Sequence, residues 1–440
     1  PSSGTALELG TSGDTITVPT GAGLTVVDEV KTNKVSPATG TAFALGDSGD
    51  TFTVPSGATI VNSGTATGFG ITQASFLPTA NPLIINGNMA VAQRSTSVAS
   101  AGDGYHTCDR WEEDTSGTIG TWTQTQESLT SGNAYTDGFS TAIKMDCTAT
   151  NASVGAGDRL EIRQVFEGQD LQLIKKGTAN AEKLTVAFWV KATKTGTSIC
   201  EMYDLDNNRT CSQSYTVSSS DTWEKKVLNF PADTTGVYGN DNLASLRLVF
   251  WLEAGSDFSG GTLQTTWGSV VSANRAVGQV NHGDNTSNNF HITGVQMEVG
   301  EYTSSTIPPF RHESYGANLQ RCQRYYYLHA DTAQDGGPTI GTGSIYNATI
   351  IQIGVEFPVN MRTAPSLESV TASSGYVIFH NGGTTNYDSL AVGNFTYTSA
   401  GCTAVQVGAT GASGMTGGQA CWTRGNSTGA GIMCAMSAEL

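Results

Sequence analysis

The sequence predicts an all-β protein, and three observations lead to this prediction: its composition, its alternation of apolar residues and a short internal repeat. Gly accounts for 53 of the 440 residues, a larger share than the usual ~7%. Only 14% of the residues are charged, against a typical ~25%. Such chains are typical of many short strands joined by tight turns. We expect four parts, namely a β shaft at 1–75, a β-sandwich at 82–312, a linking helix at 313–329 and a C-terminal β-domain at 330–440.

The shaft is predicted from a repeated unit. Residues 9–22 and 45–58 are identical at 11 of 14 positions, and both contain the pattern SGDT-x-TVP. Gly and Asp favour a turn and Pro ends strand pairing, which leaves a strand too short to be stable alone. We therefore expect three chains to wrap together as a homotrimer, with Ile16, Val18, Phe52 and Val54 packing along the shaft. A flexible repetitive linker is the alternative.

The sandwich is predicted from period-2 alternation. In 160–166, 184–190 and 245–253, aliphatic and Phe side chains occupy one face and mostly polar residues the other. Trp189 and Trp251 fall on the face opposite the aliphatic one. In 290–299 the alternation shifts by one residue at Gly294, which predicts a β-bulge.

The linking helix is predicted from one apolar face. Leu319, Cys322, Gln323 and Tyr326 follow helical spacing, and the segment QRCQRYYY that contains them is expected to pack between domains or against neighbouring chains. Alternation in 349–359 then returns to a strand pattern, and 375–380 and 431–438 are expected to be further strands of the last domain.

Charge and cysteine usage restrict the partners. The net charge is −16 and no basic cluster occurs, so nucleic acid is not an expected partner. No run of 18 apolar residues exists, so membrane insertion is not expected. The eight cysteines lack metal-ligand spacing and are expected to be buried free thiols, with no metal site and no cofactor.

Catalytic residues are not predicted. Glycan cleavage needs two carboxylates roughly 5 to 9.5 Å apart, and the candidates are the WEED segment, 111–114, and Asp204 with Asp206. WEED is more typical of a solvated turn, and no nucleophile–base pattern accompanies either group. The oxygen donors of DLDNN, 204–208, resemble the start of a calcium loop but lack its later Gly and Glu, so an Asx-rich turn is favoured.

Glycan binding is the sharper hypothesis. Sugars expose apolar C–H faces and hydroxyls, so their sites combine an aromatic ring with polar side chains. Trp189 and Trp251 are the candidate rings, with Arg247 on the same strand face as Trp251. The alternative is that both faces of the sheet are covered and the two indoles belong to the core.

Several segments, taken together and in this order, resemble a known family. They are NPLIINGNMAVAQRSTS, CDRWEED, FWVKATKTGT, HITGVQMEVGEYTSSTIPPFRHESYGANLQRCQRYYY and FPVNMRTAPSL, which span residues 81 to 367. The chain resembles bacteriophage tail fibre and related virion fibre proteins that carry a carbohydrate-binding-module-like jelly-roll domain. The resemblance implies a trimeric, non-enzymatic virion appendage. Within these motifs Trp111, beside Asp109 and Arg110, is expected to be a buried indole flanked by a charge pair.

The functional hypothesis follows from the glycan site and the resemblance together. We expect a trimeric virion fibre protein, located on the tail or capsid, that binds a glycan of the bacterial surface during adsorption. Its other partners would be virion tail or capsid proteins, contacted through the N-terminal region. A purely structural fibre or decoration protein is one alternative, and a glycan-cleaving tailspike is another.

Overall fold

The computed structural model describes residues 82–330, 339–369, 376–381, 383–387, 389–392, 402–410, 414–425 and 434–440. All of them belong to one unit of the chain, Gln73–Leu440. The shaft residues Ile16, Val18, Phe52 and Val54 lie outside the described residues. The prediction of an all-β protein is confirmed, because antiparallel sheets dominate the described part.

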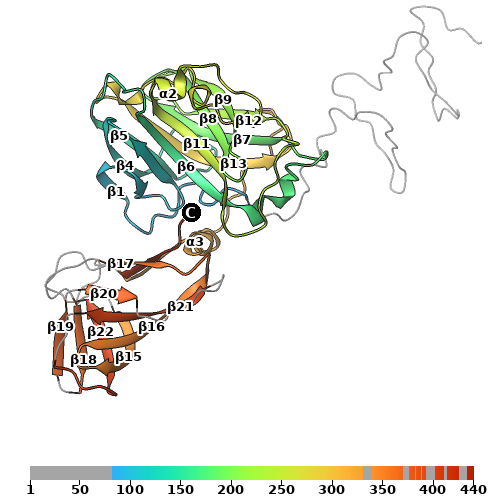
Figure 1. The fold of residues 1–440 in the computed structure, drawn as a ribbon. Coiled ribbons are helices and arrows are strands. Elements are labelled where there is room, and N and C mark those ends of the chain that lie inside the picture. The colour runs from blue at the N-terminus through green and yellow to red at the C-terminus, as the bar shows by residue number, and fades with distance from the viewer. Residues whose placement is uncertain are drawn as a thin grey trace, which may run out of the picture. The chain divides into compact units, whose positions relative to one another are not determined.

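Two antiparallel sheets form a sandwich (Figure 1). In spatial order, sheet A consists of β1 (Ser97–Ala101), β4 (Thr121–Ser128), β5 (Thr141–Ala149), β13 (Asn289–Val299), β7 (Leu184–Ala192) and β10 (Glu224–Phe230). Sheet B consists of β12 (Gly268–Ser269), β9 (Arg209–Val217), β8 (Gly196–Asp204), β11 (Ala244–Ala254), β6 (Arg159–Glu167), β3 (Glu112–Ser116) and β2 (Gly104–Tyr105).

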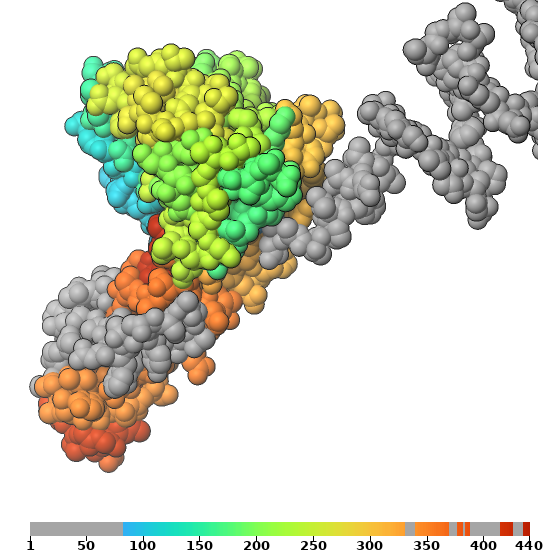
Figure 2. Space-filling model, turned by 45° about the vertical axis from the view of Figure 1, so that its right-hand side comes forward, coloured from blue at the N-terminus to red at the C-terminus, as the bar shows by residue number. Residues whose placement is uncertain are grey.

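Short helical segments lie in the connections between these strands. They are α1 (Asn133–Thr136), η2 (Gly168–Ile174), α2 (Ser256–Ser259), η3 (Ser272–Asn274) and η4 (His282–Asp284). In the space-filling view, the residues coloured green to yellow form a continuous surface over the sandwich (Figure 2). None of the helices in the described part of the chain is long and apolar enough to span a bilayer.

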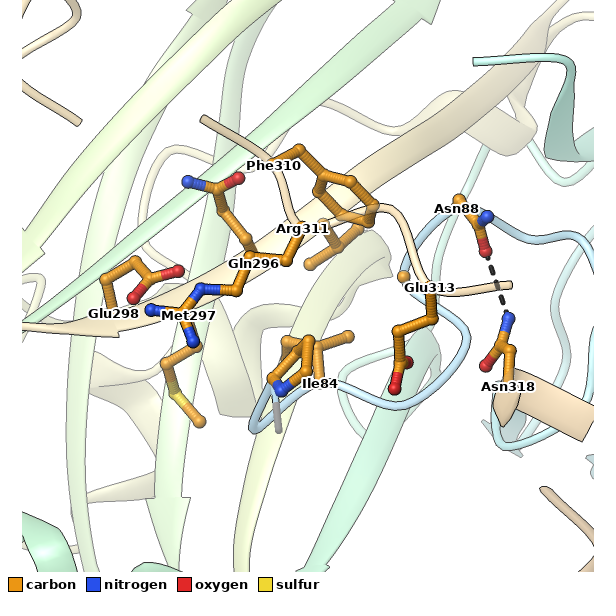
Figure 3. A pocket seen from close by; sticks show the side chains of 12 residues that line it. Ile84, Asn88, Gln296, Met297, Glu298, Phe310, Arg311, Glu313 and Asn318 are labelled. Atoms are coloured by element: carbon orange, nitrogen blue, oxygen red, sulfur yellow. Dashed lines mark hydrogen bonds between the residues drawn. The ribbon is translucent and has the colours of Figure 1, made fainter. Parts of the chain in front are cut away.

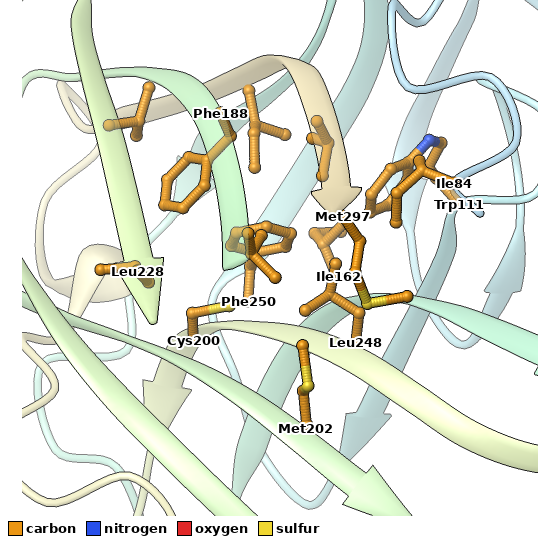
Figure 4. Close-up of a cluster of buried hydrophobic side chains, with 14 of the residues drawn as sticks. Ile84, Trp111, Ile162, Phe188, Cys200, Met202, Leu228, Leu248, Phe250 and Met297 are labelled. Atoms are coloured by element: carbon orange, nitrogen blue, oxygen red, sulfur yellow. The ribbon is translucent and has the colours of Figure 1, made fainter. Parts of the chain in front are cut away.

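The core lies between sheets A and B because each strand sends alternate side chains inward. Phe188, Phe250, Leu248, Met297 and Ile162 meet there, as Figure 4 shows. Phe188 and Phe250 pack edge to face at 5.0 Å between ring centroids. The alternation predicted for 160–166, 184–190 and 245–253 is therefore confirmed, and it places the opposite residues of these strands on the two outer faces.

Two local predictions in the sandwich are also confirmed. The register of β13 shifts between Thr293 and Gln296, and Gly294 adopts a φ of 61° there, as expected for a bulge. The Trp111 indole is fully buried and donates to the backbone oxygen of Asn86 at 3.1 Å. The neighbouring charges do not pair with each other, however, because Arg110 contacts Glu439.

The linking helix is α3 (Tyr315–Gln323), capped by the Ser314 hydroxyl, which accepts from the backbone nitrogen of Ala317. This helix is shorter than predicted, because the helical spacing in the sequence extends to Tyr326, whereas α3 ends at Gln323. Tyr326 is not helical but begins strand β14, because the chain there pairs with β23. Directly after the helix, the Arg324 guanidinium and the Tyr325 hydroxyl both donate to Glu167 of β6, so this segment packs against the sandwich as expected.

The C-terminal region contains two further antiparallel sheets (Figure 1). Sheet C consists of β14 (Tyr326–Ala330), β23 (Cys434–Ser437) and β17 (Ser366–Ser369). Sheet D consists of β19 (Gly383–Tyr387), β18 (Tyr376–His380), β22 (Ala420–Gly425), β15 (Thr339–Asn347), β16 (Ile350–Met361), β21 (Cys402–Thr410) and β20 (Ser389–Val392). Their apolar side chains form a core separate from that of the sandwich.

Candidate functional site

The outer face of sheet A carries a mixed aromatic and charged surface. Directly paired residues of neighbouring strands share a face, so the strand register shows which side chains lie together. One row across the sheet contains Thr293 of β13, Trp189 of β7 and Lys225 of β10. We call Trp189, Lys225 and the adjacent Asp137 the Trp189 site.

Trp189 lies at the centre of this site and is partly exposed. Its indole nitrogen donates to Oδ2 of Asp137 at 3.0 Å. The Lys225 ammonium lies 3.5 Å from the same oxygen and 5.9 Å from the centroid of the indole ring. An aromatic face is therefore bordered by a carboxylate that accepts hydrogen bonds and an ammonium that donates them.

A short helical turn positions Asp137. The backbone nitrogen of Asp137 donates to the Asn133 carbonyl and ends α1, and Gly138 follows with a φ of 99°. Ala134 of this turn is buried in a small cluster with Leu129, Phe139 and Trp223, against which Trp189 packs. Burial of this cluster holds the turn against the sheet, so that Asp137 meets the indole.

The neighbouring row of sheet A is more deeply buried. It contains Lys144 of β5, His291 of β13 and Lys191 of β7. Nε2 of His291 lies 3.0 Å from Oε2 of Glu127, and the Trp223 ring packs edge-on against the imidazole at 5.9 Å. Burial lowers the pKa of His291, although Glu127 acts against this shift.

The charges on this face are balanced. Lys144, Lys191 and Lys225 pair with Asp146, Asp221 and Asp137 respectively. The face therefore has no excess of positive charge that would select a polyanion. Its paired charges and exposed ring suit an uncharged ligand with hydroxyl groups.

Sequence reasoning found Trp189 but missed its polar neighbours. Asp137 comes from a loop and Lys225 from a strand remote in sequence, and neither is marked by a motif. Lys225 could have been found only by knowing that β10 pairs with β7 in a register that places it opposite Trp189.

Trp251, the second predicted ring, is a core residue. It lies on sheet B, so the structure does not bring it together with Trp189. Its side chain is 0% exposed because Phe258 of α2 and Arg275 cover it, at 5.5 Å and 4.9 Å from the ring centroid. The indole nitrogen donates to Glu201 at 3.1 Å. The expectation of an exposed platform is corrected here, since the segments after β11 fold back over this face.

Arg247 lies on the same outer face of sheet B as Trp251. It is half-buried, and its guanidinium carbon lies 6.0 Å from the ring centroid of Tyr203. Burial lowers the pKa of Arg247, and Arg163 nearby lowers it further. Arg247 therefore belongs to a dense charged surface rather than to the Trp189 site.

The carboxylates considered for catalysis are engaged in structural contacts. WEED is not a solvated turn: Glu112, Glu113 and Asp114 lie in β3, which pairs with β6. Nε of Arg163 donates to Glu112 at 2.7 Å, and its Nη1 lies 2.9 Å from Asp114. Glu113 points inward, and burial raises its pKa to about 8.

The DLDNN segment forms an Asx-rich turn, as favoured. The backbone nitrogen of Asn207 donates to Asp204 at 3.0 Å, and the Asp204 carboxylate also contacts the Lys176 ammonium at 2.5 Å. Asp206 instead accepts from the backbone nitrogen of Gly239. Among the residues that the structure describes, no group of three His, Cys, Asp or Glu side chains is arranged to hold a metal ion.

The cysteines with described side chains are free and buried, as predicted. They are Cys108, Cys147, Cys200, Cys211, Cys322, Cys421 and Cys434. Burial raises the pKa of the Cys211 thiol to about 12 and that of Cys147 to about 11, so neither is a ready nucleophile at neutral pH.

The cavities of the described residues do not compete with the Trp189 site. The cavity in Figure 3, lined by Ile84, Asn88, Phe310, Asn318 and others, holds about 10 Å³, enough for roughly one water molecule. Two wider hollows of about 380 and 340 Å³ flank η2. Their aromatic residues, Tyr238 and Tyr325, are almost fully buried and present no ring face to a ligand.

Comparisons with known proteins find structural likeness alone. No family model and no curated protein matches the sequence. Tailspike protein 4 of bacteriophage CBA120, in its enzymatically active domain, is 12% identical with a TM-score of 0.26, over 50% of this chain and 21% of that one. The chain thus spans about a fifth of the length of that tailspike chain.

Two smaller proteins are covered almost completely. A putative sugar-binding protein from Bacteroides thetaiotaomicron is 12% identical with a TM-score of 0.27, over 50% of this chain and 100% of that one. The family 11 carbohydrate-binding module of a Clostridium thermocellum cellulase is 8% identical with a TM-score of 0.25, over 46% of this chain and 95% of that one. Likeness at this level identifies no ligand or activity for the present chain.

Proposed function

We propose that this chain is a trimeric virion fibre protein that binds a glycan of the bacterial surface through the Trp189 site during adsorption. The observation that carries the proposal is the partly exposed Trp189 ring, bordered by Asp137 and Lys225 on an outer sheet face. Its attachment to other tail or capsid proteins would use the N-terminal region.

The chemistry of the site favours a sugar. A pyranose ring offers an apolar C–H face that can stack on the indole, and its hydroxyls can bond to a carboxylate and an ammonium at the rim. Because Asp137 also accepts from the indole nitrogen, the ring and the carboxylate are held in a fixed relation before a ligand arrives. Such preorganisation reduces the entropy cost of binding.

A trimer would compensate for weak single sites. One indole and two rim groups are a small contact surface, so the affinity of each site is expected to be low. Three copies on one fibre can raise the apparent affinity by roughly 10²-fold or more where the geometry permits simultaneous contact.

The test is binding of the full chain to immobilised lipopolysaccharide and capsular polysaccharide from a panel of bacteria. We expect Trp189→Ala to weaken the apparent affinity at least about tenfold, equivalent to roughly 1.4 kcal/mol in the apparent binding free energy. Leu243→Ala, which truncates an exposed residue of a loop beside β11, is the control and should bind as the parent does. Equal binding by Trp189→Ala and the parent would refute the site.

The same assay separates the alternatives. Binding with release of reducing sugar ends would support a glycan-cleaving tailspike. Neither binding nor cleavage would support a purely structural fibre or decoration protein. Sedimentation of a folded monomer at low micromolar concentration would refute the trimer independently of the glycan result.

A further inference from the structure

Sheet D carries a second aromatic surface, remote in sequence from Trp189. Phe379 of β18 and Trp422 of β22 are directly paired across the two strands. Their rings stack with centroids 4.8 Å apart and planes 24° apart. Figure 1 shows β18 and β22 side by side within the C-terminal sheet.

The two rings lie on the face of sheet D that points away from its core. The residues adjacent to them along the strands, Ile378, Cys421 and Thr423, are buried on the opposite face. Trp422 is 36% exposed and Phe379 is half-buried. These two aromatic side chains therefore do not contribute to the described apolar core, which the other face of the same strands already builds.

Across the strands, polar side chains border both rings, whereas along the strands Val377 and Ala420 are the next residues on the same face. In the same row, Thr384 of β19 pairs with Phe379, and Thr342 of β15 pairs with Trp422. The next row contains Asn386 and Arg424, both paired with Val377. Thr342, Thr384 and Asn386 are exposed.

The Arg424 guanidinium reaches over the aromatic pair. Its central carbon lies 5.2 Å from the Phe379 centroid and 5.7 Å from the Trp422 centroid. This geometry is a cation–π contact, which helps to fix the orientation of the rings. The exposed portion of Trp422 is thus held by Phe379 on one side and by the guanidinium above.

From these contacts we infer that the face formed by Phe379, Trp422, Thr342, Thr384, Asn386 and Arg424 is a second glycan-binding surface, distinct from the Trp189 site. Hydroxyl and amide side chains both donate and accept hydrogen bonds, as sugar hydroxyls do. Three of the four polar side chains are uncharged, and the single charged one, Arg424, has its guanidinium over the two rings. The expected ligand is a glycan built from neutral sugars.

A subunit contact is the competing explanation, and the composition of the face argues against it. Stable protein interfaces bury roughly 1,200–2,000 Å² in total around an apolar centre. Here the two rings lie among exposed Thr and Asn side chains as well as Val377, Ala420 and, farther along β15, Tyr346. This mixed pattern matches the apolar and hydroxyl surface of a sugar better than an apolar protein surface. We therefore propose a glycan, rather than another subunit, as the ligand of this face.

The experiment compares full-chain variants on O-antigen polysaccharides with neutral repeat units and on capsular polysaccharides with acidic ones. Trp422→Ala should weaken binding to neutral polysaccharides at least about tenfold. Tyr315→Ala is the matched control, because Tyr315 is a 59% exposed aromatic residue of helix α3, outside sheet D. It should bind as the parent does.

Each other outcome overturns the inference. Trp422→Ala with unchanged binding, or a parent chain that binds none of the neutral polysaccharides, excludes a glycan surface here. A Trp422→Ala variant that sediments at a smaller mass than the parent identifies a subunit contact instead. Comparison with Trp189→Ala distinguishes the two sites. If Trp189→Ala loses binding and Trp422→Ala does not, the result supports the Trp189 site and refutes the surface around Trp422.

Discussion

Lys176 is a buried cation whose charge is neutralised within the chain. Its ammonium lies 2.5 Å from Asp204 and 3.1 Å from Asp233, and it donates to the carbonyls of Thr235 and Gly236 at 2.9 Å each. Four oxygen atoms from two separate segments surround it, much as they would surround a bound metal ion. Asp204 of the DLDNN segment therefore serves an internal ion pair.

We predict that Lys176→Met destabilises the sandwich by about 3–5 kcal/mol, because it leaves the fully buried Asp204 without its counter-charge, whereas Asp233 keeps Arg209. Chemical denaturation followed by tryptophan fluorescence would measure the loss. Lys175→Met is the matched control, since Lys175 and its partner Glu182 are exposed and such pairs contribute only ~0–1 kcal/mol. Similar losses in both variants would contradict the role of the buried pair.

Glu113 is a buried carboxylic acid whose contribution to the stability of the folded chain depends on pH. It is fully buried in β3 and accepts from the Gln124 amide at 3.3 Å, and burial raises its pKa from 4.5 to about 8. Between these two values the folded chain holds a proton that the unfolded chain releases. The contribution of Glu113 to stability therefore falls as the pH rises through this window.

We predict that Glu113→Gln becomes progressively more stable than the parent between pH 5 and 8. The difference should grow by up to about 1.4 kcal/mol per pH unit, because Gln cannot ionise. Denaturation curves at several pH values test this. Glu301→Gln, at an exposed position, is the control. Parallel stability curves for Glu113→Gln and the parent would show that the carboxyl does not carry the pH dependence.

At the scale of elements, the bulge in β13 determines which side chains of that strand reach the core. Before it, Phe290 and Ile292 point inward, and after it Val295 and Met297 do. The outer face gains space at Gly294, into which the Phe139 ring packs: an added Cβ would lie 2.6 Å from that ring. The bulge and the cluster beneath the Trp189 site are thus one structural feature.

We predict that Gly294→Ala destabilises the sandwich by about 1–3 kcal/mol. A non-Gly residue is strained at a positive φ, and the added methyl group would displace Phe139. Because Phe139 supports α1, glycan binding at the Trp189 site should weaken as well. Gly354→Ala in β16 is the control, since an added Cβ there meets open space. Unchanged melting of Gly294→Ala would contradict this account.

At the scale of the whole molecule, the last residues of the chain connect the C-terminal region to the sandwich. The Glu439 carboxylate contacts the fully buried guanidinium of Arg110, which also lies 3.5 Å above the Tyr325 ring. Arg362 donates to the carbonyls of Ala438 and Glu439 and to that of Asn242 before β11. Residues far apart in sequence therefore form one charged contact region, which we call the joint and which is centred on Arg110, Arg362 and Glu439.

We predict that Glu439→Gln costs about 3–5 kcal/mol by leaving the Arg110 guanidinium buried without its counter-charge. Because the joint couples the two regions, calorimetry should show that this variant unfolds in separate transitions for the sandwich and the C-terminal region. The exposed pair Lys183–Glu301 provides the control in Glu301→Gln, which should unfold as the parent does. An unchanged thermogram for Glu439→Gln would show that the joint does not couple them.

How much of the structure can be predicted from the sequence depends on how far apart in the chain the interacting residues lie. The alternation in β6, β7 and β11, the bulge at Gly294 and the buried Trp111 could be predicted, because each is set by neighbours within a few residues or by plain apolar character. The sequence favours a turn for Glu113, since nothing local shows that β3 pairs with β6. It favours the helix for Tyr326 for the same reason, since the partner strand lies at the C-terminal end of the chain.

The sequence by itself determined the all-β class, the sandwich, the helix before the last sheets and Trp189 as a candidate ring, because side-chain period and turn chemistry are local properties. Only the tertiary structure decided that Trp189 is partly exposed and Trp251 is not. Both residues occupy the same kind of position in their strands, opposite the aliphatic face. The difference arises because Phe258 and Arg275, which follow β11, fold back over one outer face, and residue order alone does not specify what covers a sheet.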